Sequence, residues 1–545
     1  MGYLLHLLVA LLGQGLAEAG WNTGWRIPWV LLLLVGVPRL LAWSARRLYL
    51  RGRFRSGAAM MRALTVSGPA LHVVAVCVLG WTRTLYGWFG AGIELSGWPR
   101  LGLLLSLLPF VVYEIASIEA RARVTMPSQA DRRAWTSFQA RMLLSGLIPI
   151  AGYVIVSAAV GANETLRVQI EEVPAFGAAF AAALLAILVL ALPSLLRNVW
   201  DTVPFPPGRE RELLGAVAER ARFRASALLA WNTGDLMANA AIVGIGPRTR
   251  VVFFSDALLA QLDGPELAAV FAHEIGHAVR RHVLIFVAWA AGFFLLADLA
   301  ANFLFPGDPW LAGGFVLAAV VAWIFAFGFA SRRFELEADL YCLELLGDAS
   351  ALIRALEKVG GRFRDVASWR HFSTAERVRF LEGAAVDPRI GEALRRGLRR
   401  WTRVGVLLLL VACTLQASSL AHSFPEDRLR ADLRLGHYAS AHARAASIDH
   451  LDPHLADLVA RAASLGSDEP PLQELEKRAR AAMQRADVAA ALGWLDLAGL
   501  RGSADLDEVA GALREVAEQR ADPAKVLDPR LGASWQAELE ACRPQ

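Results

Sequence analysis

Cysteine is scarce in this sequence, and no two cysteines are spaced as a close pair. The 545 residues contain four cysteines and no C-x-x-C pattern. Two of them, Cys77 and Cys413, fall inside long apolar runs. Disulfide frameworks and cysteine-based zinc sites are recognised by regular or closely paired cysteines. The sequence therefore argues against both classes.

Lysine is also nearly absent, since only three of the 56 basic residues are lysines. The arginines cluster beside apolar stretches. They do not form the stripe with interleaved aromatic residues that nucleic-acid binding would favour. We therefore expect no nucleic-acid partner and interpret the positive charges as signals of membrane topology.

The first apolar stretch of the sequence is not expected to be a cleaved signal peptide. The stretch 3–16 is apolar, but no basic residues precede it and no convincing small-residue cleavage site follows. A cleaved signal peptide would have both features. We expect residues 1–26 to be an apolar segment that lies at the membrane interface or forms an additional span.

Apolar residues are abundant. They make up 55% of the chain, with a mean hydropathy of +0.40, while 20% of the residues are charged. This balance favours a membrane helix bundle combined with soluble parts. Eight stretches approach the length of about 20 residues that a membrane-spanning helix needs. They are 27–43, 68–89, 101–118, 142–160, 176–196, 283–305, 310–330 and 404–420.

The sequence therefore predicts an all-α polytopic membrane protein with about eight transmembrane helices. Between the spans we expect a catalytic domain with a small β-hairpin over residues 240–254, and after them a soluble α-helical domain. The expected segments are 1–26, a five-helix region 27–196, a first catalytic segment 197–282, a helix pair 283–330, a second catalytic segment 331–403, an eighth span 404–421 and the helical domain 422–545.

Basic residues are unevenly distributed among the loops. The loops after the first and third spans hold clusters of arginine, whereas the loops that alternate with them hold only Arg100 and Arg167 beside several glutamates. Positively charged loops stay on the cytoplasmic side of a membrane. We therefore expect a multi-pass protein of the cell's inner (cytoplasmic) membrane with residues 197–282 and 331–403 in the cytoplasm. Residues 422–545 would lie on the outer, periplasmic or extracellular, side.

The C-terminal residues have helical periodicity and a faint repeat signal. Residues 435–438, Leu-Gly-His-Tyr, followed by Ala441 are similar to part of a tetratricopeptide helix. A second copy at the period of about 34 residues is not evident. We predict a small helical domain that offers a surface to a protein partner, and leave open whether it is repeat-like.

Residues 273–277 read His-Glu-Ile-Gly-His. On a helix, His273 and His277 project from one face and can hold one Zn²⁺, with Glu274 beside the metal. Pro265 and the helix-forming residues after it support a helix here. The pattern therefore predicts one zinc ion per chain.

A catalytic zinc needs a third protein ligand. His282 lies about 180° from His273 around a regular helix, so we expect it to be an interface or packing histidine. Glu335 and Asp339 are separated by one helical turn, directly after the seventh span. They supply a candidate ligand and a carboxylate to orient a zinc histidine. Glu337 points about 200° away on a regular helix, which predicts a surface charge.

These motifs resemble the membrane gluzincin zinc peptidases, the family that includes the CAAX prenyl endopeptidases and the HtpX-type proteases. The resemblance rests on His273-Glu-Ile-Gly-His277 and on Ser331-Arg-Arg-Phe-Glu335-x-x-Ala-Asp339. The arrangement of spans is more similar to the CAAX prenyl protease type. The resemblance implies zinc-dependent hydrolysis of peptide bonds.

Two further segments resemble the family. Asn239 and Ala240 correspond to its edge strand, which implies that they bind extended substrate. His371-Phe-Ser-Thr-Ala-Glu-Arg377 is similar to the family's His-Pro-Pro-x-x-Glu-Arg segment, with Phe372 and Ser373 in place of the prolines. The resemblance implies that His371 and Arg377 lie near the active site and contribute to catalysis.

Residues and resemblance together predict a metalloendopeptidase. Zn²⁺ held by His273, His277 and Glu335 would activate a water molecule, and Glu274 would act as the general base. The expected substrates are membrane-associated, lipidated or misfolded membrane proteins in contact with the lipid bilayer.

Two other classes compete with this prediction. A catalytically silent zinc-containing scaffold or sensor would act through its C-terminal helical domain, but the intact Glu274 favours an enzyme. A transporter would carry ionisable residues within its spans and show internal symmetry. The spans here are nearly free of charge.

Overall fold

The computed structural model describes most of the chain. The described residues are 27–81, 104–105, 107–361, 364–367, 371–465, 471–518, 522, 526–527 and 529–543. The apolar stretch 3–16 lies outside them, as do parts of the second and third expected spans. The chain divides into two compact units, which are described separately: Met1–Ala159 with Leu184–Gln416, and Val160–Ala183 with Ala417–Gln545.

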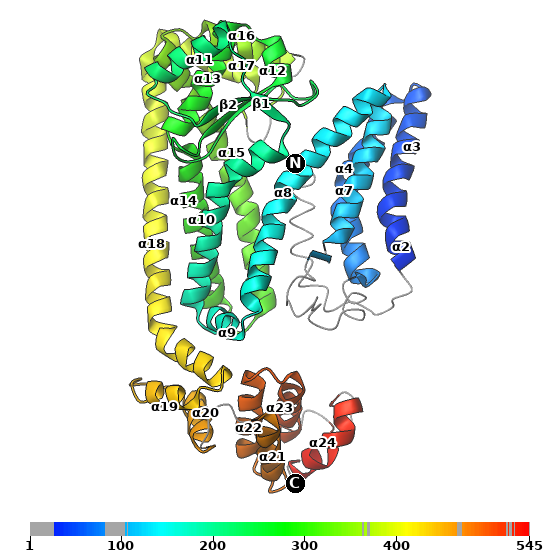
Figure 1. Cartoon of the computed structure of the whole chain (residues 1–545), viewed down its shortest axis with the longest axis vertical. Coiled ribbons are helices and arrows are strands. Elements are labelled where there is room, and N and C mark those ends of the chain that lie inside the picture. Colours follow the sequence, from blue (N-terminus) through cyan, green and yellow to red (C-terminus); the bar gives the residue numbers. More distant parts are fainter. Residues whose placement is uncertain are drawn as a thin grey trace. The chain divides into compact units, whose positions relative to one another are not determined.

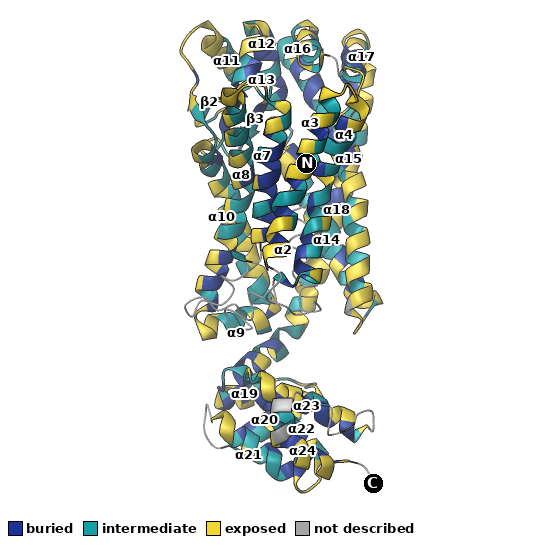
Figure 2. Cartoon of the chain, turned by 90° about the vertical axis from the view of Figure 1, so that its right-hand side faces the viewer, coloured by how far each residue is buried: buried dark blue, intermediate teal, exposed yellow. Residues whose placement is uncertain are grey.

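The first helices of the first unit pack on one another. They are α2 (Ile27–Leu31), η3 (Leu32–Gly36), α3 (Val37–Leu50), α4 (Phe54–Val73), η4 (Val74–Val78) and α7 (Leu108–Thr125). Of these, α7 carries the most buried residues, and Figure 2 shows much of it in dark blue. The Tyr113 hydroxyl on α7 donates a hydrogen bond of 2.6 Å to the Leu64 carbonyl oxygen on α4. This bond ties the two helices together.

A four-stranded sheet lies in the first unit (Figure 1). Its order is β1 (Thr202–Pro204), β2 (Ala227–Trp231), β4 (Val251–Ser255) and β3 (Ala240–Val243). β3 pairs antiparallel with β4, as the sequence predicts for residues 240–254. The parallel pairing of β2 with β4 was not predicted. Within the described residues, β3 therefore has a neighbour on one side only.

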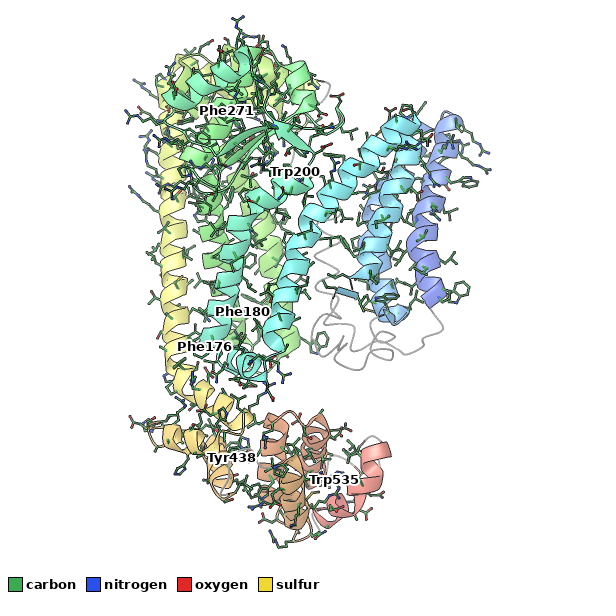
Figure 3. The ribbon with its side chains drawn as sticks, in the orientation of Figure 1. Phe176, Phe180, Trp200, Phe271, Tyr438 and Trp535 are labelled. Carbon is green, nitrogen blue, oxygen red and sulfur yellow. The ribbon has the colours of Figure 1, made fainter. Side chains whose placement is uncertain are left out.

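Five helices accompany the sheet: α11 (Arg209–Arg220), α12 (Asp256–Gln261), α13 (Gly264–Val279), α16 (Ser350–Gly360) and α17 (Thr374–Val386). Their apolar faces form one core with β4. Phe271 of α13, labelled in Figure 3, is completely buried and meets Phe254 edge to face at 5.7 Å. Buried aromatic pairs of this kind stabilise a core beyond their area alone. The packing fixes α13 against the sheet.

Within the described residues, seven helical segments are long and apolar enough to cross a membrane. They are Pro28–Leu50, Phe54–Val78, Gln129–Gly161, Pro174–Val199, Gly264–Leu304, Trp310–Leu346 and Pro388–Arg434. Gly264–Leu304 contains α13 and the more apolar α14 (His282–Leu304), which corresponds to the expected span 283–305. The expected span 101–118 is not among the seven, since α7 begins at Leu108 and part of the stretch lies outside the described residues.

The long helices expose large apolar side chains. These helices are α8 (Gln129–Gly161), α10 (Pro174–Val199), α14, α15 (Pro309–Leu346) and α18 (Pro388–Arg434). Leu190, Val287, Phe325 and Leu407 are examples, each at least half exposed. Figure 2 shows such exposed residues in yellow along these helices. A contiguous apolar surface of this extent needs a non-aqueous environment.

The second unit is helical in its described residues. It contains α9 (Glu164–Glu172), α19 (Tyr438–Ala445), α20 (Pro453–Ala463), α21 (Leu472–Met483), α22 (Val488–Leu500), α23 (Ala504–Ala517) and α24 (Pro529–Ala541). Leucine, alanine and valine side chains fill its core together with Tyr438 and Trp535, both labelled in Figure 3.

Two turns in the second unit have the same construction. Gly436 and Ala486 each follow a helix with positive φ, at 77° and 57°. In the first turn the amide of His437 donates to the Asp432 carbonyl oxygen at 2.9 Å, and in the second Asp487 donates to Ala482 at 3.0 Å. A residue in the left-handed region closes a helix C-terminus in this way. The turns between α18 and α19 and between α21 and α22 thus share one backbone conformation and lie farther apart in the sequence than the repeat period of about 34 residues.

Candidate metal centre

The histidine-bearing helix α13 has a well-defined beginning. The Asp263 side chain accepts a hydrogen bond from the Glu266 amide at 2.9 Å, and Glu266 accepts one from the Asp263 amide at 3.0 Å. This reciprocal capping box satisfies amides that a helix N-terminus would otherwise leave unpaired. Glu266 is buried and also accepts from Lys358 of α16 at 2.6 Å. The start of α13 is therefore fixed both locally and to a neighbouring helix.

His273 and His277 project from one face of α13, as their spacing predicts. Their Nε2 atoms lie 3.2 Å apart. The helix α15 brings Glu335 opposite them, with carboxylate oxygens 3.7 Å from His273 Nε2 and 3.6 Å from His277 Nε2. One ligand atom from each residue lies within 4.8 Å of the other two. Two imidazoles and a carboxylate converging in this way fit a tetrahedral zinc site with one open position.

The close approach of α13 and α15 depends on a small residue in the His-Glu-Ile-Gly-His segment. A Cβ atom added to Gly276 would lie 3.1 Å from the Ala338 Cα atom. Contacts this short force the helices apart unless one side lacks a side chain. Gly276 therefore allows the approach that places Glu335 beside the two histidines.

Asp339, one turn after Glu335, holds the outer nitrogen of His273. Its Oδ1 atom lies 2.8 Å from His273 Nδ1, and the Arg377 guanidinium donates to both carboxylate oxygens at 2.6 and 2.8 Å. Burial alone would raise the pKa of Asp339, but the charge and hydrogen bonds of Arg377 and the bond with His273 hold it below its usual range. An ionised Asp339 fixes His273 in the form that presents Nε2 to a metal.

Glu274 and His277 have shifted protonation equilibria that suit their positions. Burial raises the pKa of Glu274 to about 7, despite the opposing charge of His273. Burial and the positive charge of His273 lower the pKa of His277 to about 3. A neutral imidazole is the form that binds a metal, and a carboxylate with a pKa near neutrality is suited to exchange protons.

A cavity of about 420 Å³ opens beside these residues. Glu274, His371, Asn239 and Ala240 line it together with the His–His–Glu group. His371 is 47% exposed, and its Nδ1 atom lies 3.4 Å from a Glu335 oxygen. All the site residues predicted from the sequence are thus near one cavity, except that Asp339 lies behind the histidines.

Arg377 also lines the cavity, but most of its guanidinium binds carboxylates. Nε and Nη2 bind Asp339, and Nη1 lies 3.6 Å from Glu335. The structure thus places Arg377 where it orients the carboxylates of α15.

One expectation from helical geometry was wrong. Glu337 is not a surface charge, because its side chain is 13% exposed and its Oε2 atom lies 2.9 Å from His282 Nε2. His282 is a buried packing histidine, as expected, but its Nδ1 atom also lies 2.8 Å from His277 Nδ1. The assumption that one regular helix continues to His282 failed, since α13 ends at Val279 and Arg281 has a φ of 58°.

The site thus combines two histidines and a glutamate that could hold a metal ion with the carboxyl group of Glu274 and a cavity. Residues 211–431 match the model of peptidase family M48, so this part of the chain is similar to that family.

Several curated proteins match part of the chain. The Protease HtpX homolog of Listeria monocytogenes serotype 4b is 31% identical over 156 residues, covering 23% of this chain and 50% of that protein. The Protease HtpX homolog 1 of Streptomyces coelicolor is 35% identical over 140 residues, 23% of this chain and 45% of that protein. The CAAX prenyl protease 1 homolog of Arabidopsis thaliana is 27% identical over 201 residues, 33% and 47% respectively.

The chain spans about half the length of these curated relatives. Among solved structures, the crystal structure of S. mikatae Ste24p is 17% identical with a TM-score of 0.43, covering 65% of this chain and 99% of that one.

Proposed function

We propose that the protein is a zinc-dependent endopeptidase of a membrane. The observation that carries this proposal is the convergence of His273, His277 and Glu335 at one wall of a cavity that Glu274 also lines. When bound by the first three residues, zinc supplies the Lewis acidity that activates water and polarises a peptide carbonyl.

Glu274 is the general base in this proposal. Its carboxylate takes a proton from the attacking water and returns it to the leaving amine, which an acid with a pKa of about 7 can do near neutral pH. The carboxyl group remains unmodified throughout, since no acyl-enzyme is required. His371, half exposed in the cavity, donates to the oxygen that becomes negative as the carbonyl is attacked.

Substrate lies along β3. Within the described residues this strand is paired on one side only, and Asn239 and Ala240 at its beginning line the cavity. An extended peptide can add to such an edge through main-chain hydrogen bonds. Leu352, Leu356 and Val359 of α16 form an apolar wall of the same cavity, which favours an apolar side chain next to the scissile bond.

The substrates in this proposal are membrane-associated, lipidated or misfolded membrane proteins. The apolar helices would keep the catalytic domain at the surface of a bilayer, where such proteins are concentrated. We further propose the inner membrane, a cytoplasmic catalytic domain and an outward C-terminal domain, because arginine is concentrated in the loops on the catalytic side. The helices α19–α24 would then bind a protein partner outside.

The proposal is tested by purifying the wild type and Glu274→Gln in detergent and measuring bound zinc and cleavage of an unfolded membrane protein, with and without chelator. We expect both forms to bind zinc, and the variant to lose about 10²–10⁴-fold in cleavage rate. Equal cleavage by the two forms would refute the role of Glu274. Zinc binding without cleavage by either form would favour a silent scaffold or sensor that acts through its C-terminal helices.

A further inference from the structure

His282 connects a proposed zinc ligand to a carboxylate that the mechanism does not use. Its Nδ1 atom lies 2.8 Å from Nδ1 of His277, and its Nε2 atom lies 2.9 Å from Oε2 of Glu337. The His282 side chain is 2% exposed and that of Glu337 is 13% exposed. Both ring nitrogens of a buried histidine therefore have a partner.

The proposed metal site determines which atoms donate and which accept in the hydrogen bonds from His277 through His282 to Glu337. His277 presents Nε2 to the other ligands, so a neutral ring carries its proton on Nδ1. That N–H donates to Nδ1 of His282, which must then carry its own proton on Nε2. The Nε2–H donates to the Glu337 carboxylate, which can only accept when ionised. One arrangement of protons satisfies all three groups.

We propose that His282 and Glu337 are positioning residues that fix the tautomer and orientation of His277 as a zinc ligand. This inference rests on the proposed zinc site. The two zinc histidines are then held differently, because Asp339 contacts His273 directly whereas Glu337 acts on His277 through an intervening imidazole. Partners of this kind raise the affinity of a site by restricting the motion of its ligands.

The backbone and the packing hold His282 in the required place. Arg281, with a φ of 58°, turns the chain between α13 and α14, so that His282 at the start of α14 returns toward His277. The imidazole stacks on Phe334 with ring centres 4.3 Å apart and an angle of 16° between the planes. Phe334 is itself completely buried on α15, the helix that carries Glu335 and Glu337. The ring therefore has little freedom to rotate away.

Packing alone does not account for this pair. An apolar side chain could stack on Phe334 equally well, and it would not require a carboxylate nearby. A buried imidazole beside a carboxylate costs free energy unless both are hydrogen-bonded. Here both bonds exist, and they lead to the metal site.

The test measures zinc affinity by competition with a chelator in detergent for the wild type, His282→Leu, Glu337→Gln and the double variant. We expect His282→Leu to weaken zinc binding about 10–100-fold and Glu337→Gln to weaken it less. The double variant should bind zinc as His282→Leu does, because the carboxylate acts only through the histidine. Glu344→Gln, on the same helix but 41% exposed, is the matched control and should bind zinc as the wild type does.

Thermal unfolding of the zinc-free proteins separates positioning from packing. If His282 positions His277, the zinc-free variants unfold near the wild-type temperature while their zinc affinity is lower. Unchanged zinc affinity in folded His282→Leu and Glu337→Gln would overturn the inference, as would additive losses in the double variant. If His282→Leu does not fold, Glu337→Gln alone decides the outcome through its zinc affinity. This test measures zinc binding, whereas the Glu274→Gln experiment measures peptide cleavage. A wrong inference about His282 can therefore be distinguished from an absence of peptidase activity.

Discussion

The cores of the catalytic segment 202–386 and of the C-terminal helices 438–545 differ in what they bury. The catalytic core encloses ionisable side chains, among them Glu266, His273, His282 and Asp339. Within the described part of residues 438–545, no charged side chain is buried, and the core consists of apolar residues. Charged side chains there are at least partly exposed and form pairs such as Arg461 with Asp457.

This difference indicates what each region is built for. Burying an ionisable group costs free energy even when it is paired. In the catalytic core, ionisable side chains are buried where they hold or orient proposed metal ligands. The C-terminal core follows the ordinary rule of apolar residues inside, which suits a domain that presents a surface.

The largest effect on stability should come from Asp339→Ala. This change leaves the Arg377 guanidinium, 13% exposed, without its two-bond partner. We expect the free energy of unfolding of the catalytic region to fall by about 3–5 kcal/mol, measured by chemical denaturation in detergent. Glu344→Ala removes the ion pairs of a 41% exposed carboxylate with Arg280 and Arg395 and should change the free energy of unfolding by about 0–1 kcal/mol. If Asp339→Ala and Glu344→Ala lowered the free energy of unfolding equally, the buried carboxylate would contribute no more to stability than the exposed one.

A purely apolar change in the other core should affect stability alone. Leu495 is completely buried on α22, and Leu495→Ala should cost about 2–5 kcal/mol of unfolding free energy in the C-terminal helices. Leu472→Ala, at a position 37% exposed, serves as the control. Zinc content and peptide cleavage should stay at the wild-type level. Loss of zinc from folded Leu495→Ala would contradict the separation of the two cores.

The buried charges should also make activity depend on pH. Glu274 must be ionised to accept a proton, and its pKa is raised to about 7 by burial. A neighbouring zinc ion lowers that value, so we expect kcat/KM to fall on the acid side of about pH 7, by about tenfold per pH unit below the apparent pKa. Zinc content is measured at each pH to separate titration of the base from loss of metal. A rate that rises as the pH falls through this range would contradict the assignment.

The smallest effect concerns the two equivalent turns of the C-terminal unit. Ala486 adopts a φ of 57° where Gly436 has 77°, and a side chain disfavours this region by about 1 kcal/mol. Ala486→Gly should therefore raise the unfolding free energy by about 0.5–1 kcal/mol, and Gly436→Ala should lower it by a similar amount. Thermal unfolding of the two variants checks this pair. The same sign for both changes would show that the turns are not equivalent.

The proposed metal ligands could be predicted because their spacing follows local helical geometry. His273 with His277, and Glu335 with Asp339, each lie one turn apart on a helix, so the sequence alone places each pair on one face. The β3–β4 hairpin was predictable for a similar reason, since both strands and their turn are contiguous in the sequence.

The contacts that orient the proposed metal ligands were harder to predict from the sequence. The break before His282 occurs at Arg281, where neither glycine nor proline marks a turn. Glu337 finds its partner on a different helix, so its position around α15 indicates nothing until the packing of α14 is known. The parallel pairing of β2 with β4 likewise joins strands separated by β3 in the sequence. The beginning of an apolar stretch directly after His282 was the one available sign of a new helix.

The most direct test of the central claim is a measurement of the metal itself. Zinc X-ray absorption and metal analysis should be applied to the purified wild type and to Glu335→Gln. The account predicts one zinc per chain in the wild type, with two imidazole nitrogens at about 2.0–2.1 Å and a carboxylate oxygen at about 2.0–2.2 Å, and much weaker binding in the variant. A folded wild type that binds no zinc, or binds it equally well without the Glu335 carboxylate, would contradict the account.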